Sequence, residues 1–442
     1  MGKGRKRTTV LRVLALVVAL SFYPFAFSPV PLSSSARAES VISTSTREGR
    51  LAVFDDVWSA INLRYYDRSF HGLDWEAQRA AFRPRAAEAN SGQELYAVLR
   101  RMIASLNDPH TRVFGPEEKF DWWRPRFVTI GITVRDVGGL PTVVQVERGS
   151  APQRAGIRTG DVIETVDGAA ASVLINNALA NRGPEVSAAS RMRAFARLLD
   201  GPAETAVEVG WTGKDGSERS GQFRRYWQQR ELQLRVRKVK GQYAVVEMDA
   251  FTNLTAANFA NYLNDKLKGI RGVIVDLRAN GGGDAEAMAD VASAFLGAGF
   301  SLGQFTDRSG VSFTISTRSR SPLLPERIPQ TELPLIVLTS ERTSSAAEIF
   351  TAAMKTAKRA TIIGSETCGC VLAIRTRHEL PDGGLLDISE LDYQTATGDR
   401  LEGHGQKPDE TIALERSDLY SGRDRALELA ISKLARLRSE QH

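Results

Sequence analysis

The stretch VLTSERTSSAAEIFTAAMK, residues 337–355, decides the fold of this chain. An apolar segment that reads as a buried strand runs into a turn of small residues and then into an amphipathic helical pattern. Ser344 and Ser345 stand where the helix begins, beside backbone N–H groups that have no partner inside the helix. Such groups can hold a developing negative charge. The stretch predicts a site for a nucleophile; the alternative is that Thr343 or Ser344 simply caps the helix.

The regions around this stretch alternate between strand-like and helix-like patterns. The expected strands are 243–248, 272–277, 334–339 and 360–364. Helices are expected at about 255–267, through Met288 and Val291 to Phe295, and at 422–438, and a hairpin is expected around 381–384. Solid apolar runs that alternate with helices predict a largely buried α/β sheet with helices packed against it.

A glycine-rich turn follows the strand expected at 272–277. It reads Arg278-Ala279-Asn280-Gly281-Gly282-Gly283-Asp284. Three glycines let the backbone approach a ligand closely, and two converging N–H groups can form an oxyanion hole. A phosphate-binding turn is the alternative, but neither G-x-G-x-x-G nor a Walker pattern is present.

The chain changes character twice before this region. Residues 50–106 carry apolar side chains at helical spacing, and the pattern ends before Pro109, which stops a helix. Residues 127–215 alternate apolar and polar residues between turns, which is typical of strands. The sequence therefore predicts a multidomain α/β protein with a helical N-terminal segment and an inserted β-domain.

The β-domain resembles a PDZ domain in the order and spacing of its turns. The matching features are the loop Thr129-Ile130-Gly131-Ile132, the turn Ser150-Ala151-Pro152, and Gly160-Asp161-Val162-Ile163 before Val166-Asp167-Gly168. The resemblance implies that a peptide adds as a strand to the sheet edge and that N–H groups near Gly131 hold its terminal carboxylate. A β-domain used only for packing or gating is the alternative.

The ordered set of segments resembles the C-terminal processing (tail-specific) serine proteases and the related core of the tricorn protease. The motifs that agree are DPHT at 108–111, the PDZ loop, VDLRANGGGD at 275–284 and TSSAAEI at 343–349. The resemblance implies an α/β protease core with a crotonase-like sheet-and-helix arrangement. The expected parts are a signal peptide at 1–38, a helical domain at 39–125, a PDZ domain at 126–220, the core at 221–420 and a C-terminal helix at 421–442.

The resemblance also implies which residues perform the reaction. In this family the nucleophile is the serine three residues before the glutamate of Ser-Ala-(Ser/Ala)-Glu, which here is Ser345 before Glu348. The glycine turn of the family donates a backbone N–H to the oxyanion. Gly282 or Gly283 would therefore act together with the N–H of Ala346.

This chain departs from the family at the general base. Members with a serine–lysine pair carry the lysine in Phe-Gly-Lys-Gly, with a glutamine four residues later. The aligned residues here are Cys368-Gly369-Cys370-Val371, followed by Ile374. Cys370 would be a poor base, because an unperturbed thiol is mostly neutral at pH 7. A disulfide between the two cysteines is not expected, because so short a loop is strained in most backbone conformations.

The tricorn-like branch of the family suggests a different base. It uses a histidine from the segment before the PDZ domain and a glutamate late in the core, and the matching residues here are His110 and Glu402. A histidine with an unperturbed pKa of about 6.5 suits general-base catalysis at neutral pH. The serine that precedes the histidine in that branch is Pro109 here, so Thr111 or Asp108 would have to support His110.

Other interpretations of these residues stay open. His110 can cap or pack in its turn, Glu402 can be a solvated turn residue, and His404 competes as the base. Two cysteines and five scattered histidines form no zinc motif, so neither a metal nor an organic cofactor is expected.

Residues 1–38 read as a secretory signal peptide. They carry six basic residues and no acidic one, an apolar run at 13–27 and the cleavage pattern Ala36-Arg37-Ala38. Their charge accounts for the whole formal net charge of +6, so the rest of the chain gives no argument for nucleic-acid binding. The apolar run is short for a spanning helix. Export into a periplasm or an equivalent lumen is expected, with an uncleaved membrane anchor as the alternative.

Together these observations predict an exported serine endopeptidase of the C-terminal processing type. Its PDZ domain would bind the C-terminus of a polypeptide substrate, and Ser345 would form the acyl-enzyme. A catalytically inactive peptide-binding scaffold is the alternative, because the family lysine is lost. The retention of Ser345, the turn 281–283, His110 and Glu402 favours an enzyme.

Overall fold

The computed structural model describes residues 42–439 apart from 119–120, 122–123, 181–185, 267–268 and 322–326. The signal peptide expected at 1–38 lies outside these residues. Within the described ranges, no helix combines the length and the apolar character that a membrane crossing requires.

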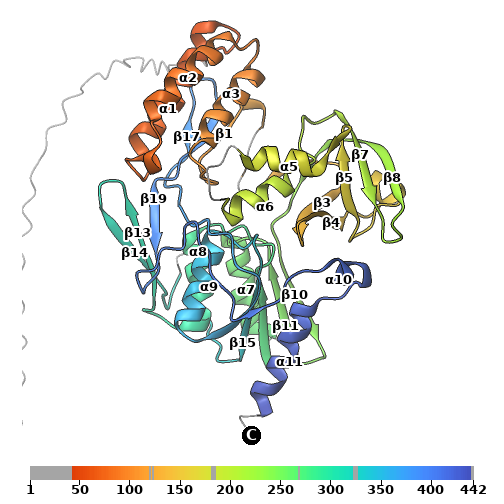
Figure 1. The fold of residues 1–442 in the computed structure, drawn as a ribbon. Helices are drawn as coiled ribbons and strands as arrows, with labels where there is room; N and C mark the ends of the chain where they lie inside the picture. The colour runs from red at the N-terminus through yellow and green to blue at the C-terminus, as the bar shows by residue number, and fades with distance from the viewer. Residues whose placement is uncertain are drawn as a thin grey trace, which may run out of the picture. The chain divides into compact units, whose positions relative to one another are not determined.

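A six-stranded sheet with the order β10-β11-β12-β15-β16-β20 forms the centre of the C-terminal half (Figure 1). Its strands are β10 (Leu234–Val239), β11 (Tyr243–Met248), β12 (Gly272–Asp276), β15 (Leu335–Thr339), β16 (Ala360–Gly364) and β20 (Glu410–Thr411). β10 runs antiparallel to β11, and all other neighbours are parallel. Parallel strands are covered on both faces, which explains their continuous apolar sequences.

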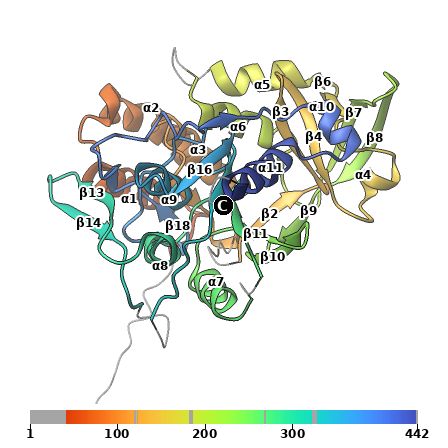
Figure 2. The same ribbon diagram turned by 90° about the horizontal axis from the view of Figure 1, so that it is seen from below.

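Helices cover both faces of this sheet. They are α7 (Asn253–Lys266), α8 (Ala285–Leu296), α9 (Ala346–Thr356) and α11 (Arg425–Ser439). Val273 and Val275 of β12 join Phe350 of α9 in one buried cluster, whereas Ile274 joins Leu434 of α11 in another. Successive side chains of a strand point to opposite faces, so α7–α9 and α11 lie on opposite sides of the sheet. Figure 2 shows β16 between α9 and α11.

The N-terminal segment is helical. It contains α1 (Arg47–Arg64), the 3-10 turn η1 (Phe70–Gly72), α2 (Trp75–Glu88) and α3 (Gly92–Ala104), followed by η2 (Pro116–Glu118). The side chains of Thr46, Asp74 and Ser91 accept backbone N–H groups at the starts of α1, α2 and α3, which is the usual role of such capping residues.

A small sheet with the order β1-β18-β17 ties this helical segment to the C-terminal half. Its strands are β1 (Arg112–Phe114), β17 (His378–Glu379) and β18 (Leu385–Asp387). Arg112 pairs with Asp387 in register, and Val113 packs with Leu99 of α3 and Leu386 of β18. A segment that follows α3 directly is thereby held against a region that comes much later in the sequence.

The β-domain is a sheet with the order β3-β4-β5-β7-β8 and with β6 paired to β5. Its elements are β3 (Ile132–Val137), β4 (Leu140–Val146), α4 (Ala151–Arg154), β5 (Val162–Val166), β6 (Ala169–Ala170), α5 (Ala171–Ala180), α6 (Ala188–Ala196), β7 (Ala206–Thr212) and β8 (Glu218–Arg224). β3 lies at the edge of the sheet. The helices α5 and α6 were not predicted, because alternation and turns dominated the interpretation of this region.

The remaining elements connect these parts. They are β2 (Arg126–Thr129), β9 (Tyr226–Gln229), β13 (Ser301–Asp307), β14 (Ser312–Ser316), β19 (Leu391–Gln394) and α10 (Arg416–Ser421). β2 pairs with β9 and not with the β-domain sheet, and β13 lies between β14 and β19. The predicted mixed α/β fold with a helical N-terminal segment is confirmed. The strands at 243–248 and 360–364 have their predicted bounds. The helix predicted at 422–438 corresponds to α11, and the short helix α10 before it was not predicted.

Candidate active site

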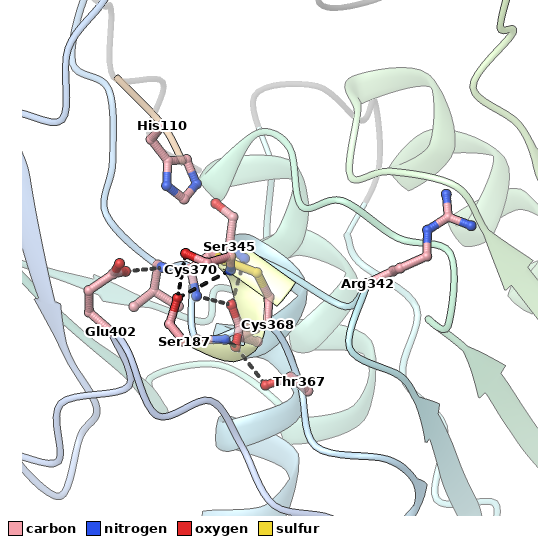
Figure 3. Close-up of a disulfide and its surroundings, with 12 residues drawn as sticks. His110, Ser187, Arg342, Ser345, Thr367, Cys368, Cys370 and Glu402 are labelled. Carbon is pink, nitrogen blue, oxygen red and sulfur yellow. Dashed lines mark hydrogen bonds between the residues drawn. A yellow bond between two sulfur atoms is a disulfide. The ribbon is translucent and has the colours of Figure 1, made fainter. Parts of the chain in front are cut away.

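Three turns meet where the parallel strands β12, β15 and β16 end. The residues of these turns are 277–284, 340–345 and 365–372. Ligands of parallel α/β sheets bind outside the carboxyl ends of the strands, because the connecting loops gather there. The turn after β15 carries Ser345, and Figure 3 shows the Ser345 hydroxyl pointing toward the imidazole of His110.

Ser345 has an unusual backbone conformation. Its φ of 56° and ψ of −126° lie in a region that residues with a side chain rarely adopt. Its N–H is held by the carbonyl of Cys370 at 2.7 Å and by Glu348 Oε2 at 3.1 Å. Ser345 occupies the N-cap position of α9. Thr343, one of the two residues considered as a simple cap, instead donates its hydroxyl to the carbonyl of Leu277 at 2.8 Å.

Gly282 lies directly against the nucleophile. A Cβ atom added at Gly282 would stand 2.6 Å from Ser345 Cβ and 3.1 Å from the nitrogen of Ala346, and φ of Gly282 is +97°. Only glycine fits this position. The N–H of Gly282 donates to Asn280 Oδ1 at 2.8 Å. Gly282 therefore contributes space and not a free N–H, which corrects the expectation that it could donate to the oxyanion.

The N–H groups of Gly283 and Ala346 have no acceptor among the residues that the structure describes. Ala346 is the first residue of α9, where an N–H has no intrahelical partner. The backbone of Gly283 is fixed by neighbouring bonds, from Phe251 N to Gly282 O and from Asp284 N to Phe251 O, each 2.8 Å long. Gly283 and Ala346 thus remain available as oxyanion donors.

Partly buried ion pairs of Arg278 fix the start of the glycine turn. Arg278 binds Asp276 at 2.6 Å and Asp424 at 2.8 Å. Asn280 Nδ2 donates to the carbonyl of Met248 at 3.0 Å. These contacts were not predicted from the sequence, although the charged residue at the end of β12 was a signal that could have revealed them.

Glu348 organises the nucleophile turn. Its carboxylate accepts four hydrogen bonds, from Thr367 Oγ1 (2.6 Å), Gly369 N (2.7 Å), Cys370 N (2.8 Å) and Ser345 N (3.1 Å). Burial raises the pKa of Glu348 to about 7, against the lowering effect of these donors. This role of Glu348 was not predicted from the sequence, in which Glu348 served only to locate the nucleophile.

Cys368 and Cys370 form a disulfide, which corrects the expectation that they would not. Gly369 adopts φ +68°, a left-handed conformation that turns the chain. Their Cα atoms therefore lie 5.2 Å apart, within the usual range for a bridge. Figure 3 shows the bridge beside Ser345. Because Cys370 is bridged, it has no thiol that could take the place of the family lysine.

His110 enters the site from the turn between α3 and β1. Its N–H donates to Asp108 Oδ1 at 2.8 Å, and its Nδ1 lies 3.9 Å from the same oxygen. Nδ1 is buried and has no hydrogen-bond partner among the residues that the structure describes. Burial lowers the pKa of His110 to about 4, while Asp108 raises it and Arg112 and Arg193 lower it further. The imidazole is therefore neutral at pH 7 and can accept a proton.

Glu402 lies in the same region but does not face His110. Its Oε2 accepts the N–H groups of Val371 at 2.7 Å and of Leu372 at 3.2 Å. Burial raises the pKa of Glu402 to about 8, and the charge of Asp108 acts in the same direction. Asp108, and not Glu402, is the carboxylate next to Nδ1 of His110. Glu402 instead supports the turn that holds Ser345.

Two cavities are each lined by several residues of the segment 400–407. His404 is exposed and lines one of about 480 Å³ together with Thr356 and Lys407, which does not include Ser345. The other has about 520 Å³, and its wall includes Tyr65, Phe70, Leu73, Asp108, Gly369, Leu372 and Glu402. The second cavity has an aromatic wall beside the site and offers room for a substrate side chain.

The loop expected to hold a peptide carboxylate is largely occupied by its own bonds. The N–H of Gly131 donates to Thr129 Oγ1 at 2.9 Å, and Ile130 and Ile132 are buried. The carboxylate of Glu147 accepts the hydroxyl of Tyr226 at 2.5 Å close to this loop. A cavity of about 700 Å³ lies between β3, α6 and the turns that follow β15 and β16.

Within the described ranges, no group of three or more His, Cys, Asp or Glu residues is arranged to hold a metal.

Two family models match parts of this chain. Residues 242–412 match the sequence model of peptidase family S41, and residues 47–104 match the tricorn protease C1 domain. The chain is 28% identical over 387 residues to a chloroplastic C-terminal processing peptidase of Tetradesmus obliquus, covering 81% of this chain and 76% of that one. It is 28% identical over 383 residues to carboxyl-terminal-processing peptidase 1, chloroplastic, of Arabidopsis thaliana, covering 82% and 71%.

Solved structures agree with this placement. The photosystem II D1 C-terminal processing protease has a TM-score of 0.53 and 25% identity, covering 83% of this chain and 93% of that one. Mature CPAF complexed with lactacystin has a TM-score of 0.66 over 89% and 98% of the two chains, and at 14% identity this likeness concerns the fold alone. Residues 242–412 thus match peptidase family S41, and the chain is a serine-type hydrolase similar to the C-terminal processing peptidases.

Proposed function

We propose that this protein is an exported endopeptidase in which Ser345 is the nucleophile and His110 is the general base. The observation that carries the proposal is the backbone of Ser345, which is held at φ 56° and ψ −126° at the first turn of α9. Rare backbone conformations of this kind concentrate at functional sites. The N–H of Ala346 and the glycine turn lie directly beside this serine.

The reaction follows from these positions. The Ser345 oxygen attacks the substrate carbonyl carbon, and its proton passes to the neutral imidazole of His110. The N–H groups of Ala346 and Gly283 stabilise the negative oxygen of the tetrahedral intermediate. His110 then returns the proton to the leaving amine, and a water molecule hydrolyses the acyl-enzyme by the reverse sequence of proton transfers.

Two carboxylates have separate roles in this proposal. Asp108 orients His110, since it accepts the His110 backbone N–H and faces Nδ1. It also accepts the hydroxyl of Thr111 at 2.5 Å, which fixes its own position. Glu402 does not support His110. It accepts the backbone N–H groups of Val371 and Leu372 and thereby positions the turn that holds Ser345.

The β-domain is proposed to bind the C-terminus of the substrate polypeptide. β3 is an edge strand, and the cavity of about 700 Å³ lies between β3 and α6, so an extended peptide can add to β3 by main-chain hydrogen bonds. A terminal carboxylate would replace the hydroxyl of Thr129 as the acceptor for the N–H of Gly131. The segment 1–38 would direct export to a periplasm or an equivalent lumen.

Proteolysis of an unfolded, C-terminally tagged polypeptide tests the reaction. We expect Ser345→Ala to lower kcat by at least about 10⁴-fold, with peptide binding retained. Ser344→Ala is the matched control, because the hydroxyl of the neighbouring serine lies outside the proposed chemistry, and it should keep activity within about tenfold. Cleavage by Ser345→Ala at the wild-type rate would contradict the nucleophile. Binding without cleavage by the wild-type protein would favour the scaffold.

A pair of substrates tests the β-domain. The same peptide with a free or an amidated C-terminus differs only in the terminal charge. We expect amidation to raise KM by about tenfold and to leave kcat unchanged, because uniform binding energy is lost. Equal KM values for the two peptides would contradict carboxylate binding near Gly131.

A further inference from the structure

We propose that the Cys368–Cys370 bridge is a redox-active site: the bridged protein is the active form, and a dithiol reductant lowers the reactivity of Ser345. This inference rests on the proposed function. Neither the sequence motifs nor the relatives described above assign a role to this pair.

The bridged turn holds the nucleophile from one side. The carbonyl of Cys370 accepts the N–H of Ser345 at 2.7 Å. The N–H groups of Gly369 and Cys370 donate to Glu348, whose carboxylate also accepts the N–H of Ser345. The position of Ser345 therefore depends on the shape of the turn that the disulfide closes.

The same turn holds the Glu402 loop from the other side. The N–H of Gly403 donates to the carbonyl of Gly369 at 2.9 Å. A Cβ atom at Gly369 would stand 2.9 Å from the nitrogen of His404 and 2.8 Å from that of Gly405. The two backbones are therefore in close contact, so a change in the turn is transmitted to both sides of the site.

The bridge also touches the β-domain. The cysteines are 3% and 2% exposed and pack with Ala189 and Met192 of α6. The cavity of about 520 Å³ includes Ala189 and Gly369 in its wall, so it leads toward the bridge. A reductant approaches from this cavity or after a displacement of α6, and we expect reduction of the folded protein to be slow.

The chemistry requires a dithiol as the co-reactant. One thiolate of the reductant attacks a cysteine sulfur, the Cys368–Cys370 bond breaks, and a mixed disulfide forms. The second thiolate of the reductant then attacks the mixed disulfide. This step releases the remaining cysteine thiolate, and the reductant leaves as a cyclic disulfide. Two electrons pass to the protein, and the two cysteine sulfurs take up two protons.

Reduction removes the covalent link that closes the turn at Gly369. The two cysteines are then free to separate, and the hydrogen bonds to Ser345 and Glu348 lose a fixed partner. A misplacement of about 1 Å at a reacting group can cost up to about a hundredfold in rate, and a smaller displacement costs less. We therefore expect kcat to fall by about tenfold, while KM changes by less than about twofold.

Cys368 and Cys370 are the only cysteines in the sequence, so every thiol that is detected belongs to this pair. Thiols of the purified exported protein are counted in denaturant before any reductant is added. The folded protein is then incubated with dithiothreitol until alkylation and mass measurement show complete reduction. Cleavage of the unfolded polypeptide and the rate at which a fluorophosphonate labels Ser345 are measured in both forms.

The double variant Cys368→Ser, Cys370→Ser is the matched control. We expect it to show the lowered kcat without reductant and to be insensitive to dithiothreitol. Free thiols in the untreated protein, or full reduction without a change in kcat and labelling, would overturn the proposal. Wild-type kcat in the double variant would also overturn it. Failure of the proposed function is distinguishable, because Ser345→Ala would then still cleave, whereas failure of the redox proposal leaves Ser345→Ala inactive.

Discussion

The serine half and the histidine half of the site are built in different ways. The serine half comprises the turns after β12, β15 and β16. These three strands are parallel neighbours in one sheet. The histidine half comprises residues 108–111, which reach the site because β1 pairs with β18. Sheet neighbours and a glycine motif fix the first half locally. A long-range pairing fixes the second, so the two halves should respond differently to substitution.

The largest effect is expected from Gly282→Ala in the serine half. The new Cβ would lie 2.6 Å from Ser345 Cβ, and it would displace the nucleophile from its oxyanion donors. We expect kcat/KM for polypeptide cleavage to fall by about 10³-fold. Gly281→Ala is the control, because its Cβ would meet only Ser344 Oγ at 4.0 Å. Similar activities of the two variants would show that the packing at Gly282 does not position Ser345.

A second large effect is expected from Asp387→Ala at the attachment of the histidine half. Asp387 is fully buried and binds Arg377 at 3.0 Å and Arg112 at 3.6 Å. Removing one partner of a buried pair leaves uncompensated charge, so the free energy of unfolding should fall by about 3 kcal/mol. Urea denaturation measures it. Asp55→Ala, at a partly exposed pair with Arg83, should cost below about 1 kcal/mol, and equal costs would contradict the comparison.

The third effect separates the two carboxylates near the base. Asp108→Asn should lower kcat by about 10²-fold, because His110 loses the charge that favours its protonated form during the reaction. Glu402→Gln should lower kcat by less than about tenfold, because an amide oxygen can still accept the N–H groups of Val371 and Leu372. Steady-state kinetics measure both. The opposite ranking would identify Glu402 as the residue that supports His110.

The smallest effect is a pH dependence of stability from Glu402. Its pKa rises from 4.5 in the unfolded chain to about 8 in the folded protein, so between these values the folded state binds more protons. The free energy of unfolding therefore falls as pH rises through this window. Glu402→Gln should reduce the fall between pH 5 and pH 8, by about 1 kcal/mol or more. Some fall should remain, because the pKa of Glu348 is also raised. Identical slopes in both proteins would contradict the assignment.

The sequence was most informative where structure is local. The strand before Ser345, the helix after it and the glycine turn were predicted because each has its own pattern within a few residues. The parallel strands were visible as continuous apolar runs. The helices α5 and α6 were missed, because Ala-rich segments between strands carry a weak periodic signal.

The remaining features depend on three-dimensional contacts. No pattern shows that the N–H of Gly282 is bound by Asn280 or that Glu348 accepts four donors. The disulfide depends on the left-handed conformation of Gly369, and the lack of a side chain there also permits its close packing against the Glu402 loop. The lowered pKa of His110 depends on burial among groups from several segments. The choice between Asp108 and Glu402 likewise required the distances at His110.

The dependence of kcat/KM on pH, in the wild-type protein and in His110→Ala, is the measurement that decides whether His110 is the base. The groups that face His110 are Asp108, Arg112 and Arg193, and burial lowers its pKa to about 4. We expect wild-type kcat/KM to be constant at neutral pH and to fall only near pH 4, where the imidazole becomes protonated. His110→Ala should be about 10³-fold slower at pH 7. Near wild-type activity in His110→Ala, or a wild-type rate that rises through a pKa of about 8, would contradict a serine–histidine mechanism.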